Sequence, residues 1–166
     1  MSEPALRPAT DADLDRILEL NNAAVPAVNE LERSDLEWFL EVAEWFPVVE
    51  VDGEVVAFLH GLAKPPAPGY QSENWAWFVN EYDSFVYVDR IVVDPGGHGQ
   101  GIGQLLYNGF ADRSRGRFPR LCAEVNTRPR NDQSLRFHEA FGFVPVGEQE
   151  TGGGAKAVVM LSFDLS

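Results

Sequence analysis

The sequence predicts an α/β domain with a mixed sheet, and three observations support this prediction. Segments with helical spacing of apolar residues alternate along the chain with segments rich in β-branched and aromatic residues. The length of 166 residues suits one domain, and a chain of this size buries roughly two thirds of its unfolded surface. The hydrophobic fraction of 45% is too high for a disordered chain. We therefore expect one domain over residues 1–166.

The composition and net charge of the chain exclude several classes of binding partner. The chain has 26 acidic and 13 basic residues and a net charge of −13. This excess opposes binding to phosphate backbones and to anionic lipid surfaces, so we expect no nucleic acid and no membrane partner. The single cysteine, Cys122, excludes a disulfide framework within the chain, and the histidines lack the spacing of metal ligands. No apolar run is long enough to span a bilayer, and residues 1–10 do not resemble a secretory signal, so we expect a cytoplasmic protein.

Two helices open the predicted fold. Thr10 or Asp11 can cap the first helix, which the apolar spacing over residues 14–18 indicates. Ser34 is expected to begin the second helix, with Glu37 three residues later completing a capping box.

A hairpin and a long insertion follow the two helices. Residues 48–51 and 54–62 are predicted strands, because their β-rich sequences flank the tight-turn pair Asp52-Gly53. Residues 64–84 do not read as strand, and the aromatic spacing predicts a short helix over 72–81. Insertions of this length often form lids or binding loops. An aromatic stripe buried on the sheet is the alternative, and both interpretations stay open.

The second half of the chain alternates strands and helices. Its apolar patterns predict strands at 85–93, 121–125, 143–147 and 157–165, helices at 101–115 and 134–141, and a glycine turn at 152–154. This order completes the α/β pattern.

The most informative segment lies between a strand and a helix, from Asp94 to Gly103. Its glycines let the backbone turn sharply and approach a ligand, and exposed amides at a helix start attract phosphate oxygens. The segment is not a Walker loop, because no Gly-Lys-Ser/Thr follows. It is not the dinucleotide fingerprint either, because Gln104 stands in place of the third glycine. It predicts a phosphate or pyrophosphate site of another kind.

Two ordered motifs in this half resemble those of the GNAT superfamily of acyl-CoA-dependent N-acetyltransferases. That superfamily has an Arg/Gln-x-x-Gly-x-Gly/Ala loop after its fourth strand, and His98, Gly101 and Gly103 match the loop here. Residues 121–143 resemble the fifth strand, fourth helix and sixth strand that follow it. The resemblance covers residues 85–143 and implies a GNAT-like fold, with a mixed, mostly antiparallel sheet flanked by helices.

The resemblance implies acetyl-CoA as co-substrate. Backbone groups of the strand would pair with the pantetheine arm, and amides of the loop would hold the pyrophosphate. Because His98 carries less reliable positive charge than arginine, Arg128 and Arg130 are further candidates for contact with the phosphates. The expected coenzyme-binding residues are Ile91, Val92, Val93, His98, Gly99, Gln100, Gly101, Ile102, Gly103, Asn131 and Ser134.

The resemblance also implies direct attack of a primary amine on the thioester in a ternary complex. This chemistry needs a base for the amine and a proton for the leaving thiolate. The family's frequent acid is a tyrosine, and His138 stands at its position. Asp89 and Glu124, on consecutive predicted strands, are alternative candidates for the base, and a water relay is a third.

The amine acceptor is expected to meet the elements at 10–45 and 64–84. The candidate acceptor-binding residues are Asn22, Asn29, Tyr70, Trp75 and Tyr87. A small-molecule or peptide amine fits the resemblance, and the negative charge favours a cationic acceptor. The histidine in place of tyrosine also leaves open a non-catalytic acyl-CoA-binding or regulatory module. Homodimers are common in the resembling family, so a homodimer is a further expectation.

Overall fold

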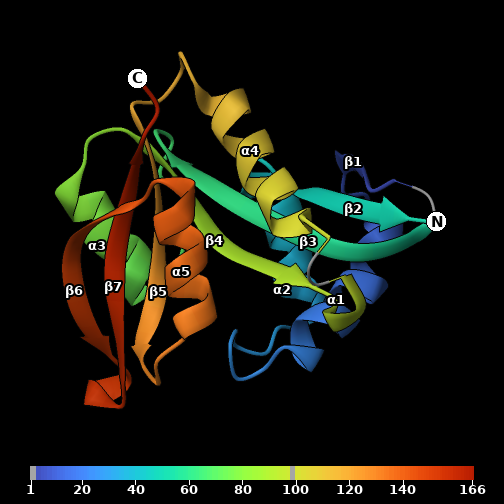
Figure 1. Ribbon diagram of the computed structural model, residues 1–166, viewed down its shortest axis with the longest axis horizontal. Coiled ribbons are helices and arrows are strands. Elements are labelled where there is room, and N and C mark those ends of the chain that lie inside the picture. The colour runs from blue at the N-terminus through green and yellow to red at the C-terminus, as the bar shows by residue number, and fades with distance from the viewer. Residues whose placement is uncertain (1–2, 98–99) are drawn as a thin grey trace. The chain divides into compact units, whose positions relative to one another are not determined.

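The computed structural model describes residues 3–97 and 100–166, and within them seven strands are hydrogen-bonded in the order β1-β2-β3-β4-β5-β7-β6 (Figure 1). Strands β4 and β5 run parallel, whereas the β1–β2, β2–β3, β5–β7 and β6–β7 pairs are antiparallel. The mixed, mostly antiparallel sheet is therefore confirmed. The chain divides into a first unit, Met1–Leu62 with Val88–Asp112, and a second unit, Ala63–Tyr87 with Arg113–Ser166.

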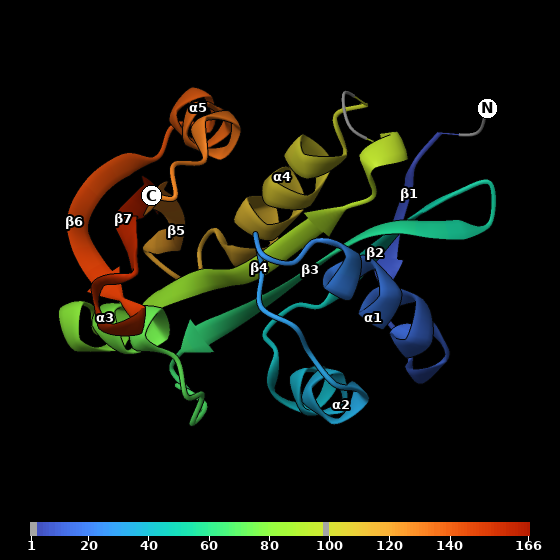
Figure 2. The same cartoon turned by 90° about the horizontal axis from the view of Figure 1, so that it is seen from below.

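The first unit holds the first two helices, most of the hairpin and most of α4. Figure 2 shows α4 on one side of its strands, with α1 and α2 on the other. The inner faces of α1 and α2 contain the fully buried residues Leu14, Ile17 and Leu36. Its elements are β1 (Ala5–Pro8), η1 (Asp11–Asp13), α1 (Leu14–Ala23), α2 (Arg33–Val42), β2 (Pro47–Val51), most of β3 (Glu54–Lys64), the end of β4 (Phe85–Val93), η2 (Pro95–Gly97) and most of α4 (Ile102–Ser114).

The second unit holds the C-terminal strands, with α3 and α5 on opposite sides of them (Figure 2). On one side, a Cβ added to Gly147 of β6 would lie 2.4 Å from the Trp77 ring of α3, so only glycine fits under that ring. On the other side, Phe141 of α5 packs on Phe163 of β7 with their ring centroids 4.9 Å apart. Its further elements are α3 (Glu73–Glu81), β5 (Arg120–Arg128), α5 (Asp132–Phe141), β6 (Val144–Thr151), η3 (Gly152–Gly154) and β7 (Lys156–Asp164).

The predicted order of elements after the first two helices is confirmed, with bounds that differ by a few residues. The start of the second helix is a correction. Glu32 precedes this helix and forms the capping box with Asp35, so Ser34 and Glu37 do not cap it. The reason is that Oδ2 of Asp35 accepts from the amide of Glu32 at 2.8 Å, which fixes the start of the helix before Ser34. No helix in the described part of the chain is long and apolar enough to cross a membrane.

Candidate active site

Strand β4 carries the residues predicted to meet the coenzyme arm. Among the described residues, its pairing with β5 is limited to Val86 with Leu121 and Tyr87 with Cys122. The half-exposed Ile91 and Val93 lie beyond this pairing, and Val92 is buried. Within the first unit, β4 is therefore an edge strand, and the backbone groups of such a strand can pair with an added extended chain.

The segment after β4 is held in place by its own aspartate. Asp94 donates its amide to the carbonyl of Val56 at 2.8 Å, and its Oδ1 accepts from the amide of Gly96 at 3.1 Å. Its Oδ2 accepts from Nη2 of Arg16, on α1, at 3.1 Å. These contacts fix the chain where it leaves the strand and turns toward α4.

The start of α4 offers the geometry of a phosphate site. Gly101 has a φ of +73°, which favours glycine, and a Cβ there would meet no described atom within 4 Å. The first amides of an α-helix have no partner inside it, and the helix dipole places positive potential there. Ile102 and Gly103, the first residues of α4, therefore suit the phosphates of a coenzyme. The predicted contacts of His98 and Gly99 lie outside the described residues.

Asp89 belongs to a buried ion pair on β4. Its side chain is 4% exposed, and its Oδ2 accepts from Nε of Arg90 at 3.1 Å. Nδ1 of His60 lies 3.3 Å from the same oxygen. Burial, and then the charge of Arg90, hold the pKa of His60 well below its usual range, so this histidine is neutral. A carboxylate enclosed in this way is poorly placed to meet an amine from solvent.

Arg90 connects this ion pair to the loop between α1 and α2. It donates from Nη1 to Oδ1 of Asn21 at 2.9 Å and from Nη2 to Oδ1 of Asn29 at 2.8 Å. Asn22 accepts from the amide of Leu31 at 3.0 Å and donates to its carbonyl at 3.2 Å. The predicted acceptor residues Asn22 and Asn29 thus both hold the loop. The contacts of Arg90 with Asn21 and Asn29 join residues 69 and 61 positions apart, so local sequence patterns do not reveal them.

Two predicted residues of the second unit meet directly. The hydroxyl of Tyr87 donates to Oε1 of Glu124 at 2.7 Å. The ring of Tyr87 is fully buried and lies 5.4 Å from Trp75 and 5.5 Å from Phe78, centroid to centroid. Trp75 is also buried, whereas Tyr70 is half-buried. The aromatic stripe of α3 therefore packs inside the unit, and Glu124 is held by a buried phenol.

His138 is a buried histidine near the end of α5. Its Nδ1 lies 2.7 Å from the carbonyl oxygen of Ser134, and a carbonyl only accepts, so Nδ1 carries a proton. Burial lowers the pKa of His138, against the opposing effect of this hydrogen bond. The neutral form is therefore favoured, and Nε2 is the site of any second proton. Asn131 caps the same helix, because its Oδ1 accepts from the amide of Ser134 at 3.1 Å.

The remaining candidates have clear structural settings. Arg128 donates to Oε2 of Glu150 at 2.7 Å, and Arg130 donates to Oδ1 of Asp132 at 2.5 Å, with both arginines exposed. Burial raises the pKa of the Cys122 thiol, which makes it a poor nucleophile. Within residues 3–97 and 100–166, no group of histidine, cysteine and acidic side chains could hold a metal ion.

Comparison with known proteins identifies the family. Residues 14–143 match the model of the Acetyltransferase (GNAT) family, which covers most of the chain and spans parts of both units. The chain therefore belongs to this family and is an acetyltransferase. The resemblance and the fold prediction are both confirmed. No curated protein matches the sequence.

Several solved structures share the fold of this chain. Arabidopsis thaliana NAA60 in complex with a bisubstrate analogue has 16% identity and a TM-score of 0.76 over 97% of each chain. The ribosomal-protein-S18-alanine N-acetyltransferase from Escherichia coli has 16% identity and a TM-score of 0.72, over 98% of this chain and 94% of that one. A phosphinothricin acetyltransferase from Sinorhizobium meliloti in complex with acetyl-CoA has 19% identity and a TM-score of 0.73, over 99% and 90%. At these identities the likeness shows the fold.

Proposed function

We propose that this chain transfers an acetyl group from acetyl-CoA to a primary amine, by direct attack in a ternary complex. The observation that carries the proposal is the edge of β4 followed at once by the open helix start at Gly101. An edge strand suits an arm that contains amide groups, and a helix start suits phosphates. When bound, acetyl-CoA supplies an acetyl group activated as a thioester. The same residues would serve acetyl-CoA, which is the coenzyme named with the Sinorhizobium meliloti relative.

The coenzyme residues follow from this arrangement. We propose that backbone groups of Ile91 and Val93 pair with the pantetheine arm and that amides at the start of α4 hold the pyrophosphate. Asn131 and Ser134 remain proposed coenzyme contacts. The cap uses only Oδ1 of Asn131, and the amide nitrogen of its side chain is a donor group that the cap does not require.

Glu124 is the proposed base. Tyr87 donates to one carboxylate oxygen, so the carboxylate is held in one orientation while it takes the proton of the attacking amine. Asp89 is the weaker candidate, because its side chain is 4% exposed and Arg90 already occupies Oδ2. Glu124 can also take the proton of the amine through a bridging water molecule, and the proposal includes this water relay.

His138 is the proposed acid for the leaving thiolate. Its Nδ1 proton is engaged with the carbonyl of Ser134, so the proton to be delivered has to come from Nε2 of the imidazolium form. Burial disfavours that form. The same fact supports the alternative, a non-catalytic acyl-CoA-binding module, because a neutral histidine accepts a hydrogen bond at Nε2 and does not deliver a proton.

A small-molecule or peptide amine is the proposed acceptor. The names of the solved relatives include a ribosomal-protein alanine and phosphinothricin as acetylated groups, which are a peptide amine and a small molecule. Tyr70 is the proposed aromatic contact, because it is half-buried whereas Trp75 and Tyr87 are buried. We further propose that the whole chain acts as one domain, and that a cationic acceptor suits its charge of −13.

Thiol release in the presence of acetyl-CoA and a panel of amines tests the function. We expect release with at least one amine, and a reduction of kcat by roughly 100-fold or more in Glu124→Gln, because a positioned base contributes about that factor. Glu148→Gln, an exposed glutamate of the same unit, is the control and should keep wild-type kcat. Tight coenzyme binding without release from any amine would favour the non-catalytic module. Equal kcat in the two variants would refute Glu124 as base.

A further inference from the structure

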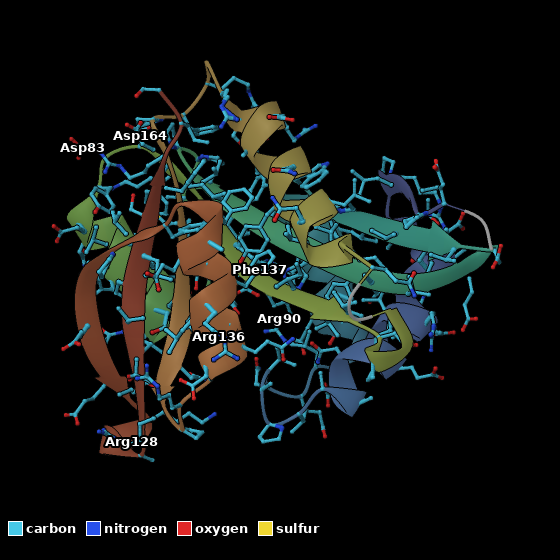
Figure 3. All side chains as sticks on the ribbon, viewed as in Figure 1. Asp83, Arg90, Arg128, Arg136, Phe137 and Asp164 are labelled. Carbon is cyan, nitrogen blue, oxygen red and sulfur yellow. The ribbon has the colours of Figure 1, made fainter. Side chains whose placement is uncertain are left out.

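Arg90 is the centre of a buried polar network in the first unit. Its side chain is 4% exposed, and its guanidinium donates to four oxygens. Nε reaches Asp89 at 3.1 Å, Nη1 reaches Oδ1 of Asn21 at 2.9 Å and the carbonyl of Asn29 at 3.2 Å, and Nη2 reaches Oδ1 of Asn29 at 2.8 Å. Figure 3 shows Arg90 on the side of β4 that faces the loop after α1. Three of these four bonds therefore go to α1 and the loop that follows it.

The loop, residues 24–31, depends on side chains for its position. Asn21 donates from Nδ2 to the carbonyl of Asn29 at 3.0 Å, and Asn22 bonds both polar backbone atoms of Leu31. Val25, the second residue of the loop, is 43% exposed and adds little apolar packing. The hydrogen bonds of Arg90 thus fasten the loop to β4 at Asn29, while Leu31 at the end of the loop packs in the apolar core.

The other end of the network reaches the second helix. Nδ1 of His60 lies 3.3 Å from Oδ2 of Asp89, and the His60 ring stacks on Phe39 of α2 at 3.8 Å between centroids. The network therefore touches α1 through Asn21 and α2 through Phe39. Both helices that flank the loop are tied to neighbouring positions of β3 and β4.

A buried ion pair contributes little net free energy to the stability of a fold. Well-packed apolar residues often replace such a pair without loss, because desolvation of the two charges opposes their attraction. Here the fork of Arg90 supplies directional bonds to one loop, which apolar residues do not provide. The pair also lies directly before Ile91, where we propose that the coenzyme arm pairs with β4.

We infer that Arg90 is a positioning residue that fixes the α1–α2 loop to β4 and thereby sets where the amine acceptor is held. This inference rests on the proposed function. The loop carries Asn29, whose Oδ1 accepts from Arg90, and follows Asn22, whose Oδ1 accepts from Nδ2 of Asn21 at 3.0 Å. The network therefore orients the side-chain amides of two predicted acceptor residues. Arg90 makes no contact with the reacting groups in this role. Its effect passes through the loop.

Two variants loosen the loop in different ways. Asn29→Ala removes the acceptor of Nη2 and keeps the ion pair of Asp89 with Arg90. Arg90→Lys keeps the charge beside Asp89 and the Asn29 side chain, but it loses the fork that reaches Asn21 and Asn29 together. Val25→Ala, an exposed change in the same loop outside the network, is the matched control.

Hydrogen exchange and steady-state kinetics are measured on all three proteins and on the wild type. In Asn29→Ala and Arg90→Lys we expect amide exchange over residues 24–31 to be about tenfold faster or more, because a hydrogen bond to a charged group is lost. We also expect the KM for the amine to rise several-fold, with the KM for acetyl-CoA unchanged. Val25→Ala should match the wild type in all three quantities.

The outcomes separate this inference from the proposed function. Wild-type exchange in both variants would overturn it, as would faster exchange with an unchanged KM for the amine. A raised KM in Asn29→Ala alone, with normal exchange, would assign Asn29 a direct contact and would also overturn the positioning role. If the wild type transfers no acetyl group to any amine, the proposed function fails. The exchange rates then still decide whether Arg90 fixes the loop.

Discussion

Replacing Asp13 with asparagine should weaken the fold in a pH-dependent way. Asp13 follows strand β1, and its carboxylate accepts from both terminal nitrogens of Arg7 at 2.8 and 2.9 Å. It also accepts from the amide of Thr10 at 2.8 Å. Arg7 in turn donates to Glu50 on β2 at 2.7 Å. The carboxylate thus helps to hold the N-terminal strand in place.

The magnitude follows from the pKa. The hydrogen bonds from Arg7, and then those from Thr10, lower the pKa of Asp13 from 3.8 to about 2, against the opposing effect of burial. A difference of roughly 1.8 pKa units is worth about 2.4 kcal/mol at neutral pH. Because Arg7 is 34% exposed, solvent screening reduces this to about 2 kcal/mol. The folded chain keeps Asp13 ionised at lower pH than the unfolded chain. The stabilisation is therefore complete above about pH 4 and is lost as the pH falls through 2.

Urea unfolding of wild type and Asp13→Asn measures this difference. We expect a gap in the free energy of unfolding of about 2 kcal/mol at pH 7 and about 1 kcal/mol at pH 3. Asp15→Asn is the control, because Asp15 is 89% exposed, and it should change the free energy little at either pH. A gap for Asp13→Asn that is the same at both pH values would refute the linkage argument.

Two further predictions concern the proposed site. Because burial lowers the pKa of His138, its imidazolium is scarce at neutral pH, so kcat should rise as the pH falls from 8 toward 6. His138→Ala should slow turnover and abolish this rise, and an identical pH profile in the variant would remove the acid role. Gly101→Val places a β-branched residue at φ +73° and fills open space. Calorimetric titration should then show acetyl-CoA affinity reduced by about tenfold or more, and unaltered affinity would contradict the phosphate site.

Local patterns in the sequence carry much of the fold. The Asp52-Gly53 turn, the aromatic spacing of α3 and the β-rich run of β4 each predict an element that the structure contains. Such signals work because turn formation and helix periodicity depend on residues only a few positions apart. Such local patterns do not predict strand β1. Its four residues include an arginine and a proline, and it exists because it pairs with Pro47–Glu50.

The candidate site likewise has features that the sequence predicts and features that it does not. The glycine segment before α4 and the order of the two motifs are visible in the sequence, and they indicate the family that the model over residues 14–143 confirms. The partners of the polar side chains are not visible there. Arg90 and Asn21 are 69 positions apart, and Tyr87 and Glu124 are 37 apart, yet each pair shares a hydrogen bond.

The sequence by itself determined that this chain is an acidic α/β protein with two ordered motifs of the GNAT family. Only the tertiary structure decided how its candidate catalytic residues differ. Asp89 is enclosed by Arg90, Glu124 is oriented by Tyr87, and His138 is buried with its Nδ1 proton engaged. The physical reason is that residue type sets which chemistry a side chain can perform. Burial and hydrogen-bond partners, which come from distant parts of the chain, set whether it carries the charge that the chemistry needs.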